Sequence, residues 1–240
     1  MNLHTDKKLF SQTILATAKN TNINEIFIEK DYWITLILSR LSESRYASQT
    51  VFKGGTSLSK GYGLISRFSE DVDIAIIEQK EKSGNVVKTI IRTVEKQISA
   101  GLKEIVVDDV TSKGSRYRKS VFEYESTIQK NPSNRLMLEV NSFANPYPFQ
   151  SMLIKSFVYD FLISTDNKKL IDKFGLSPFE INVLSKEQTL LEKLVSLIRF
   201  SFDDNTSAAL SSKIRHFYDL YFLFNDEECN GFIKSKEFKS

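Results

Sequence analysis

The chain has 240 residues, of which 41% are hydrophobic and 26% are charged, and its formal net charge is +3. These values fit a globular protein with a sizeable core and exclude wholesale disorder. The strong basic excess of many nucleic-acid binders is missing, although 33 basic residues could still form a local basic groove. One cysteine, Cys229, and two histidines, His4 and His216, exclude a disulfide framework and argue against a zinc centre.

No segment is expected to lie in a membrane. The N-terminus holds no apolar core of signal-peptide length, and no window approaches about eighteen consecutive apolar residues. A cytoplasmic location is therefore the expectation.

The N-terminal half alternates helical and extended patterns. Within 24–41, for example, Ile26, Trp33 and Ile37 share one helical face. In chain order, the expected elements are helices at 7–19 and 24–41, a strand at 50–53, a short helix at 56–62, a strand from 71, a helix at 85–101, strands at 104–110 and 116–128 joined as a hairpin around Lys113-Gly114, and a strand at 135–143. Together they predict a mixed sheet with helices packed on it, an α+β fold.

The pattern changes near residue 145, where the sequence NPYP at 145–148 breaks the chain. A mixed segment follows, and then two long helical patterns at 186–201 and 208–225. Ser185 and Gln188 have the spacing of a capping box at the start of the first. The predicted organisation is an α/β core with N-terminal helices at 1–145, followed by a mainly helical part at 146–240.

Residues 52–58, FKGGTSL, predict a turn that approaches a ligand closely. A short strand enters Gly54 and Gly55, which let the backbone come near a ligand without side-chain interference. Thr56 and Ser57 then open a helix, whose free N–H groups suit a phosphate. Taken alone, two glycines are more typical of an ordinary turn.

Two carboxylates follow, Asp71 and Asp73, at the start of an apolar strand. Alternation along a strand puts both on one face, with Val72 and Ile74 on the other face, toward a core. Paired carboxylates on a rigid strand suit Mg²⁺, and two such ions about 3.5–4 Å apart can promote an in-line displacement at phosphorus. An isolated pair of this kind is usually a solvated strand end. Its combination with the glycine turn, on a strand where unpaired charge is costly, indicates a functional site.

The chain resembles the AbiEii toxin / nucleotidyl transferase family of bacterial toxin–antitoxin and phage abortive-infection systems. The similarity rests on KGGTSLSKGYGLISRFSEDVDIAI at 53–76, EKDYWITLIL at 29–38 and KIRHFYDLYFL at 213–223. It implies a polymerase-β-like nucleotidyltransferase core, chemistry on an NTP with Mg²⁺ (or Mn²⁺), and a cognate antitoxin. Some members resemble tRNA nucleotidyltransferases that extend the acceptor end. Many members continue beyond the last motif, so a short helical part is expected here.

The resemblance implies roles for several residues, with the helical part completing the active-site cleft. Asp71 and Asp73 would be the metal carboxylates. A third carboxylate on a neighbouring strand is usual in such sites, and Glu139 is the candidate. It would bind a second metal or accept the proton of the attacking hydroxyl, unless it lies on an exposed strand face. The residues expected to hold the triphosphate are Gly54, Gly55, Thr56 or Ser57, Arg67 and Ser69, although Arg67 is equally suited to a surface ion pair.

Two charged residues of the helical part are further candidates. Lys193 lies at the edge of an apolar helix stripe, as many surface lysines do, but LLEKLVSLIR matches the family's lysine motif. A fixed cation there would neutralise charge on the leaving phosphates. Asp219 lies in a helix that is apolar on nearly every side, so it needs a partner. Arg215, one turn earlier, is a structural partner, and Lys193 or the nucleotide is the functional alternative.

Three other features have open interpretations. Lys30 lies in the middle of an apolar helix stripe, where it pairs with a buried acid or reaches the site from behind. His216 is interpreted as an ordinary helix residue rather than a base. A basic cluster with interleaved aromatics either tracks an RNA backbone or forms a solvated hairpin. Its basic members are Lys113, Arg116, Arg118 and Lys119.

Three functions remain open at this stage. The leading one is a toxin that transfers a nucleoside monophosphate from an NTP to RNA, expected at the 3′ end of a tRNA. The second is a nucleotidyltransferase that modifies a protein or a small molecule, and the third is a non-catalytic nucleotide-binding regulator. Two metal carboxylates together with Lys193 and Asp219 argue against the third, because a pure binder need not keep them.

Overall fold

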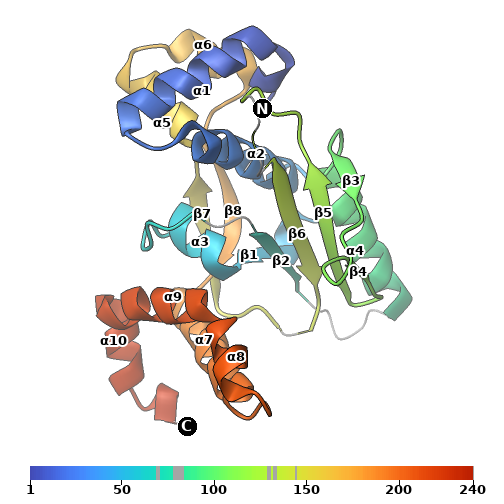
Figure 1. The fold of residues 1–240 in the computed structure, drawn as a ribbon, viewed down its shortest axis with the longest axis vertical. Coiled ribbons are helices and arrows are strands. Elements are labelled where there is room, and N and C mark those ends of the chain that lie inside the picture. Colours follow the sequence, from blue (N-terminus) through green and yellow to red (C-terminus); the bar gives the residue numbers. More distant parts are fainter. Residues whose placement is uncertain (69–70, 78–83, 129–130, 132–133, 144, 240) are drawn as a thin grey trace.

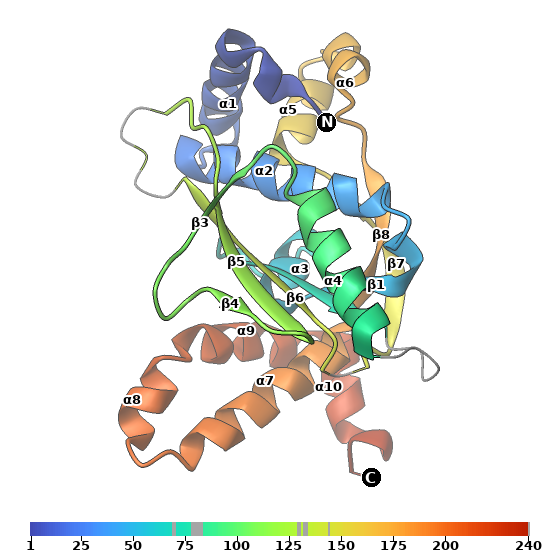
Figure 2. The same cartoon turned by 90° about the vertical axis from the view of Figure 1, so that its right-hand side faces the viewer.

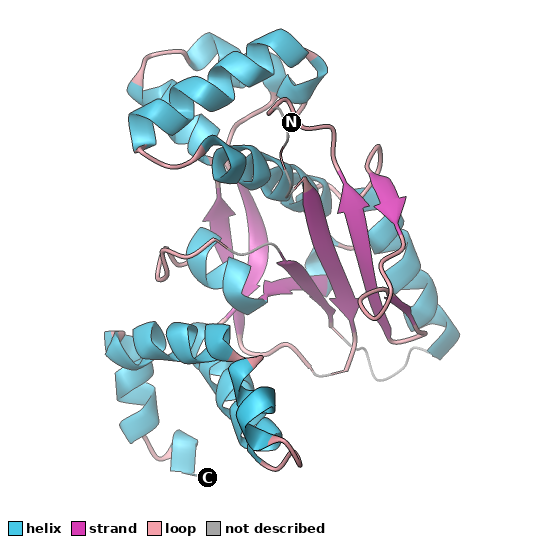
Figure 3. Ribbon diagram, viewed as in Figure 1, coloured by secondary structure: helices cyan, strands magenta, loops and turns pink. Residues whose placement is uncertain are grey.

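A mixed sheet of eight strands forms the centre of the structure (Figures 1 and 3). The structure is a computed structural model, and it describes residues 1–240 except 69–70, 78–83, 129–130, 132–133, 144 and 240. The strand order is β3-β5-β6-β2-β1-β8-β7, with β4 paired to β5. β2 is parallel to β6 and β1 is parallel to β8, whereas the other pairs are antiparallel. The strands are β1 (Thr50–Lys53), β2 (Asp71–Ile76), β3 (Lys103–Ile105), β4 (Ser112–Lys113), β5 (Tyr117–Glu123), β6 (Arg135–Asn141), β7 (Phe149–Ile154) and β8 (Phe179–Leu184).

Most helices fall into three groups around the sheet, and α3 contacts β1 and β2. α2 and α4 lie against one face (Figure 2), α1, α5 and α6 gather near α2 at one end, and α7 to α10 form a group at the other end (Figure 1). The helices are α1 (Lys7–Thr21), α2 (Glu25–Ser42), α3 (Gly54–Lys60), α4 (Gly84–Ile98), α5 (Phe157–Ser164), α6 (Lys168–Phe174), α7 (Lys186–Ser201), α8 (Thr206–Ser211), α9 (Ile214–Asn225) and α10 (Glu227–Lys234). None of the helices in the described part of the chain combines the length and the apolar character that crossing a membrane requires.

The main core lies between the sheet and α2. Val72, Ile74 and Ile76 of β2 are at most 1% exposed and pack in one cluster with residues of α2 and α4. Burying each such side chain contributes about 1.5–3 kcal/mol. Because these residues alternate with Asp71 and Asp73, the same burial turns both carboxylates to the opposite face of the sheet.

A second apolar cluster attaches the helical group to α3. Its buried members include Leu58 of α3, Leu190 of α7 and Leu220 of α9. These positions are apolar at helical spacing, so each helix presents one stripe to the cluster. The helical group is therefore fixed beside the start of β2, where the carboxylates lie.

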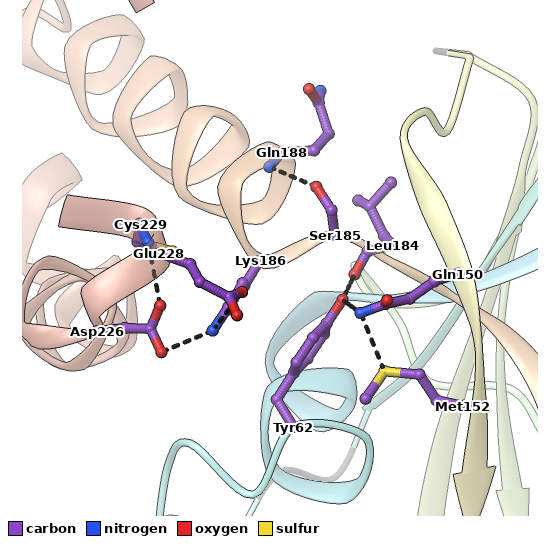
Figure 4. A network of polar contacts seen from close by, with 10 residues as sticks. All are labelled: Tyr62, Gln150, Met152, Leu184, Ser185, Lys186, Gln188, Asp226, Glu228 and Cys229. Atoms are coloured by element: carbon purple, nitrogen blue, oxygen red, sulfur yellow. Dashed lines mark hydrogen bonds and ion pairs between the residues drawn. The ribbon is translucent and has the colours of Figure 1, made fainter. Parts of the chain in front are cut away.

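A polar network joins the sheet to the helical group where β8 passes into α7 (Figure 4). Tyr62 donates a hydrogen bond of 3.0 Å to the last carbonyl of β8, and Lys186 pairs with Asp226 at 2.7 Å. Ser185 caps α7, because its hydroxyl accepts from the backbone N–H of Gln188 at 3.1 Å. These contacts set the direction in which α7 leaves the sheet.

The predicted α+β architecture, a mixed sheet with helices and a helix-rich C-terminal part, is confirmed. The helix expected at 208–225 is two helices, α8 and α9, because α8 ends at Ser211 and α9 begins at Ile214. The strands β7 and β8 were not assigned from the sequence. β7 is half exposed at the edge of the sheet and shows little alternation, so only its pairing with β8 defines it. The division at residue 145 stays a prediction. The strands β7 and β8 lie C-terminal to it and extend the same sheet.

Candidate active site

The carboxylates of β2 lie in a cleft of about 600 Å³ between the sheet and the helical group. The pairing register places Asp73 beside Lys53 of β1 and Glu139 of β6. The residues that line the cleft from α7 and α9 are Thr189, Glu192, Lys193, Ser196, Arg199, Arg215 and His216. Two segments far apart in the sequence therefore form one site.

Three carboxylates crowd the sheet side of this cleft. The pKa of Asp73 is raised to about 7, first by burial and then by the negative charges of Glu139 and Asp71. The positive charges of Lys53 and Lys119 lower that pKa, but they do not outweigh the other effects. A divalent cation near Asp71 and Asp73 would offset this repulsion, so the chemistry of these two side chains fits a metal.

The metal donors on the protein are few. Within the described part of the chain, no group of three or more histidine, cysteine, aspartate or glutamate side chains is arranged to hold a metal ion. Mg²⁺ is usually bound through one or two carboxylates together with water and substrate phosphates, rather than by a cage of protein ligands. Asp71 and Asp73 match that smaller set.

Glu139 lies on β6 and is held by two residues of β5. Its carboxylate pairs with Lys119 at 2.6 Å and is hydrogen-bonded to Tyr117. Burial and then the charge of Glu139 raise the pKa of Tyr117, so the phenol keeps its proton and donates to the carboxylate. Glu139 thus has a fixed orientation at the rim of the cleft.

The helical side of the cleft is built around a fully buried acid, Asp219. Arg67 donates to its two oxygens from Nε and Nη2, both at 2.7 Å, and Lys193 pairs with it at 2.7 Å. Burial alone would raise the pKa of Asp219, but the hydrogen bond from Arg67 and the charge of Lys193 hold it below its ordinary value. Asp219 therefore positions two cations and does not itself line the cleft. Of the two partners that the sequence offered, Arg215 is exposed, whereas Lys193 pairs with the acid as the functional alternative predicted.

The two glycines leave room for these charged groups. A Cβ atom on Gly54 would come closer than 3.0 Å to the carboxylate of Asp73, and the φ of Gly54 is +81°. A Cβ atom on Gly55 would come equally close to Nη2 of Arg67. Real Cβ atoms essentially never show such separations, so a side chain at Gly54 is excluded by both packing and its positive φ, whereas a side chain at Gly55 would require the flexible end of Arg67 to move. The sequence suggested close approach of a ligand, whereas the structure fills the space with the protein's own side chains.

The hydroxyls next to the glycines stabilise the turn. Thr56 donates to the backbone carbonyl of Asp71, and Ser57 donates to the backbone carbonyl of Gly54 at 2.8 Å. Both side chains are buried. Thr56 thus ties α3 to β2, and Ser57 closes the first turn of α3, so both hydroxyls are engaged with the backbone. Ser69, the other hydroxyl predicted to reach phosphate, lies outside the described residues.

His216 lines the cleft next to Lys193. Its pKa is lowered to about 4, first by burial and then by the charges of Lys193 and Lys213. The imidazole is therefore neutral at physiological pH. Lys30 is buried on α2 and lines a different pocket.

The basic residues predicted to contact RNA do not share one face. Arg118 pairs with Glu95 of α4 at 2.5 Å in a buried position. Lys119, the next residue, lies on the face of the sheet that borders the cleft and pairs with Glu139. Lys113 pairs with Glu104 at 2.6 Å on the surface. Alternation along β5 explains this division, because successive side chains of a strand point to opposite faces. Arg116 also has an interaction partner.

The sequence did not single out an aromatic pair at the mouth of the cleft. The rings of Tyr117 and Phe143 are stacked, with centroids 5.6 Å apart, and Phe143 is 67% exposed. Arg199 and Arg215 are exposed and line the same cleft from α7 and α9. No sequence pattern marks this combination, since its members come from β5, the loop after β6, α7 and α9.

Carboxylates suited to a metal, facing cations suited to phosphate, define a cleft for transfer chemistry on an anionic substrate. A family model described as "Nucleotidyl transferase AbiEii toxin, Type IV TA system" matches residues 36–237. The chain therefore belongs to the AbiEii nucleotidyltransferase toxin family, a family of transferase enzymes, as the sequence motifs predicted.

Other comparisons are more distant. No curated protein matches the chain. A similar solved structure is that of MenT4, the nucleotidyltransferase toxin Rv2826c from Mycobacterium tuberculosis H37Rv, with 18% sequence identity and a TM-score of 0.45. The match covers 80% of this chain and 58% of the MenT4 chain, so the present chain spans less than two thirds of that toxin.

Proposed function

We propose that this chain transfers a nucleoside monophosphate from an NTP to the 3′ hydroxyl of an RNA, with a tRNA as the expected acceptor. Mg²⁺ (or Mn²⁺) is the proposed metal. The observation that carries the proposal is that Asp71 and Asp73 face Arg67 and Lys193 across one cleft. A triphosphate between them would meet metal ligands on one side and fixed cations on the other.

The cations are positioned before any substrate binds. Asp219 holds Lys193 and the Nε–Nη2 edge of Arg67, which leaves Nη1 of Arg67 directed away from this acid. Nη1 is buried and has no hydrogen-bond partner among the described residues. It is therefore a donor available to a phosphate oxygen, and charge-assisted hydrogen bonds of this kind are strong. Groups fixed in advance lose little on reorganisation when charge develops on the phosphates.

The carboxylates divide the remaining roles. Asp71 and Asp73 would hold the metal, which when bound would polarise the α-phosphate toward attack by a hydroxyl. Glu139 would contact a second metal or accept the proton of the attacking hydroxyl, and Lys119 and Tyr117 fix its orientation for either role.

The mouth of the cleft suits an RNA end. A base can stack on the exposed ring of Phe143, and stacking of this kind contributes about 1–3 kcal/mol per base. Arg199 and Arg215 could contact backbone phosphates, which position RNA without reading its sequence. The net charge of only +3 favours recognition of a folded RNA by shape over strong non-specific binding. As a family member the protein would act as a toxin inside the cell, with a cognate antitoxin.

The test is a labelling experiment with total cell extract. The protein is incubated with each α-labelled NTP in turn, and the labelled macromolecule is identified. We expect label on RNA with one or more NTPs, none with Asp73→Asn, and none on RNA whose 3′ end has been oxidised with periodate. Label on a protein or a small molecule would replace the RNA proposal with the alternative transferase activity. Absence of label with all four NTPs would contradict the enzymatic proposal itself.

A further inference from the structure

A second pocket of about 490 Å³ lies behind the cleft, between α2, α3, the segment 63–68 and the start of α5. Its apolar walls come from Ile23, Ile34, Ile65, Phe68 and Phe157. The volume is in the range of pockets that hold small molecules. The proposed transfer reaction makes no use of this pocket.

Aromatic rings form one wall of this second pocket. The rings of Phe68 and Phe157 have centroids 6.2 Å apart and are tilted by 59°. Phe27 stacks on Phe68 at 4.2 Å and supports it from outside. Such a wall suits a planar or bulky apolar group, because aromatic side chains offer a large rigid contact area.

Polar groups in the pocket favour an anion. Lys30, Lys60, Arg67 and Lys155 line it, against the acids Asp31 and Asp160. Lys60 pairs with Asp31 at 2.5 Å and Lys155 with Asp160 at 2.8 Å, so both acids are already neutralised. Arg67 pairs with Asp219 through Nε and Nη2, but its buried Nη1 is a donor with no acceptor among the described residues. A ligand with one anionic group would satisfy it.

We propose that this second pocket binds a small organic anion with an aromatic body, and that the bound anion weakens NTP binding in the cleft. The ligand places its ring against Phe68 and Phe157 and its anionic group near Arg67. The negative coupling rests on the proposed function, because it requires that Arg67 also contacts the triphosphate.

The two sites share a wall. Arg67 lines both the cleft and the second pocket, so one guanidinium faces both ligands. The pocket also contains Thr56, whose hydroxyl donates to the backbone of Asp71. A ligand that takes the Nη1 donor removes a phosphate contact, and pressure on Thr56 acts on the strand of the metal carboxylates. A ligand that prefers one arrangement of a shared residue must shift the affinity of the other site.

Binding is tested first, without NTP. The probe is 8-anilino-1-naphthalenesulfonate, an aromatic anion whose fluorescence rises in apolar sites, and its uncharged analogue N-phenyl-1-naphthylamine is the control ligand. Ser66, which is exposed and lines the pocket, is replaced in Ser66→Trp to fill it, and Ser164→Trp on the exposed end of α5 is the matched control. Binding of the probe to apolar surface elsewhere is the same in wild type and in both variants. Differences in probe binding among the three therefore report on the pocket.

We expect the sulfonate to bind wild type and Ser164→Trp alike, and Ser66→Trp at least about tenfold more weakly. The uncharged analogue should bind wild type about tenfold more weakly than the sulfonate. Equal sulfonate binding by Ser66→Trp would overturn the pocket assignment. Equal binding of the two probes would overturn the anionic class.

Coupling is tested next, by measuring the Kd of the preferred NTP with and without saturating sulfonate. We expect the Kd to rise several-fold in wild type and in Ser164→Trp, and to stay constant in Ser66→Trp. A constant Kd in all three, with the sulfonate bound, would overturn the coupling. If wild type binds no NTP even without the sulfonate, the proposed function fails, whereas the binding experiment still decides the pocket.

Discussion

Replacing Gly55 with alanine should separate the activity of this protein from its fold. The added methyl group would lie closer than 3.0 Å to Nη2 of Arg67, which donates to Asp219 at 2.7 Å. Gly55 is helical and needs no positive φ, so the backbone itself tolerates alanine. The guanidinium is the end of a flexible side chain and is the group that must move. The substitution therefore displaces a cation of the cleft and leaves the backbone in place.

The expected magnitudes follow from the contacts that are lost. Two hydrogen bonds to a buried charge break, each worth about 1.5–3 kcal/mol. Alanine regains about 1 kcal/mol of helix propensity over glycine, so the free energy of unfolding should fall by about 2–5 kcal/mol. A misplaced cation beside the transferring phosphates should cost about 10²–10³-fold in turnover.

The assays are denaturant unfolding and single-turnover NTP transfer. The matched control is Gly231→Ala in α10, where a Cβ atom meets nothing within 4 Å, and it should keep wild-type turnover. In the double variant with Arg67→Ala, the glycine substitution should cause no further loss, because both act through the same guanidinium. Wild-type turnover by Gly55→Ala would refute the reasoning, as would additive losses in the double variant.

Other predictions address the remaining parts of the site. Asp71→Asn or Asp73→Asn should abolish transfer in a folded protein, as should a chelator, and transfer by a folded double variant would remove the metal assignment. Lys193→Ala should reduce turnover more than it reduces the free energy of unfolding; a larger loss of stability than of turnover would make the role of the lysine structural. Expression in a bacterial host should arrest growth, and Asp71→Ala should relieve the arrest; equal growth would contradict a toxin. Arg199→Glu with Arg215→Glu should weaken RNA labelling and its salt dependence while NTP binding persists; unchanged salt dependence would place RNA elsewhere.

The sequence predicted those parts of the fold that local patterns determine. The alternation of Val72 and Ile74 with Asp71 and Asp73 defined both the strand and the face of the carboxylates. The capping residue Ser185 marked the start of α7, which begins as expected at residue 186. Each of these features depends on neighbours within a few positions along the chain.

Local sequence patterns did not predict the features that depend on pairing between residues far apart in the chain. Arg118 and Lys119 looked like one basic cluster, yet they lie on opposite faces of β5 and pair with Glu95 of α4 and Glu139 of β6. Which acid meets each cation depends on how β5 pairs with β6 and on where α4 packs. Neither is encoded in the charge pattern itself, so a basic stretch of sequence did not translate into a basic surface.

Asp219 shows this limit most directly. An acid in a helix that is apolar on nearly every side must have a partner when it is buried, and that need was correctly derived from the sequence. Helical spacing offered only the local partner Arg215, and the resemblance added Lys193, which does pair with the acid. The structure also supplies Arg67, which is 152 positions away, because α9 packs against the segment that leads into β2. This choice of partner has a consequence for function. A local ion pair would only have neutralised the acid, whereas the distant one fixes a guanidinium opposite the metal carboxylates. The buried charge thus links the two halves of the cleft, and any substitution that removes it should disorganise the phosphate side while leaving Asp71 and Asp73 in place.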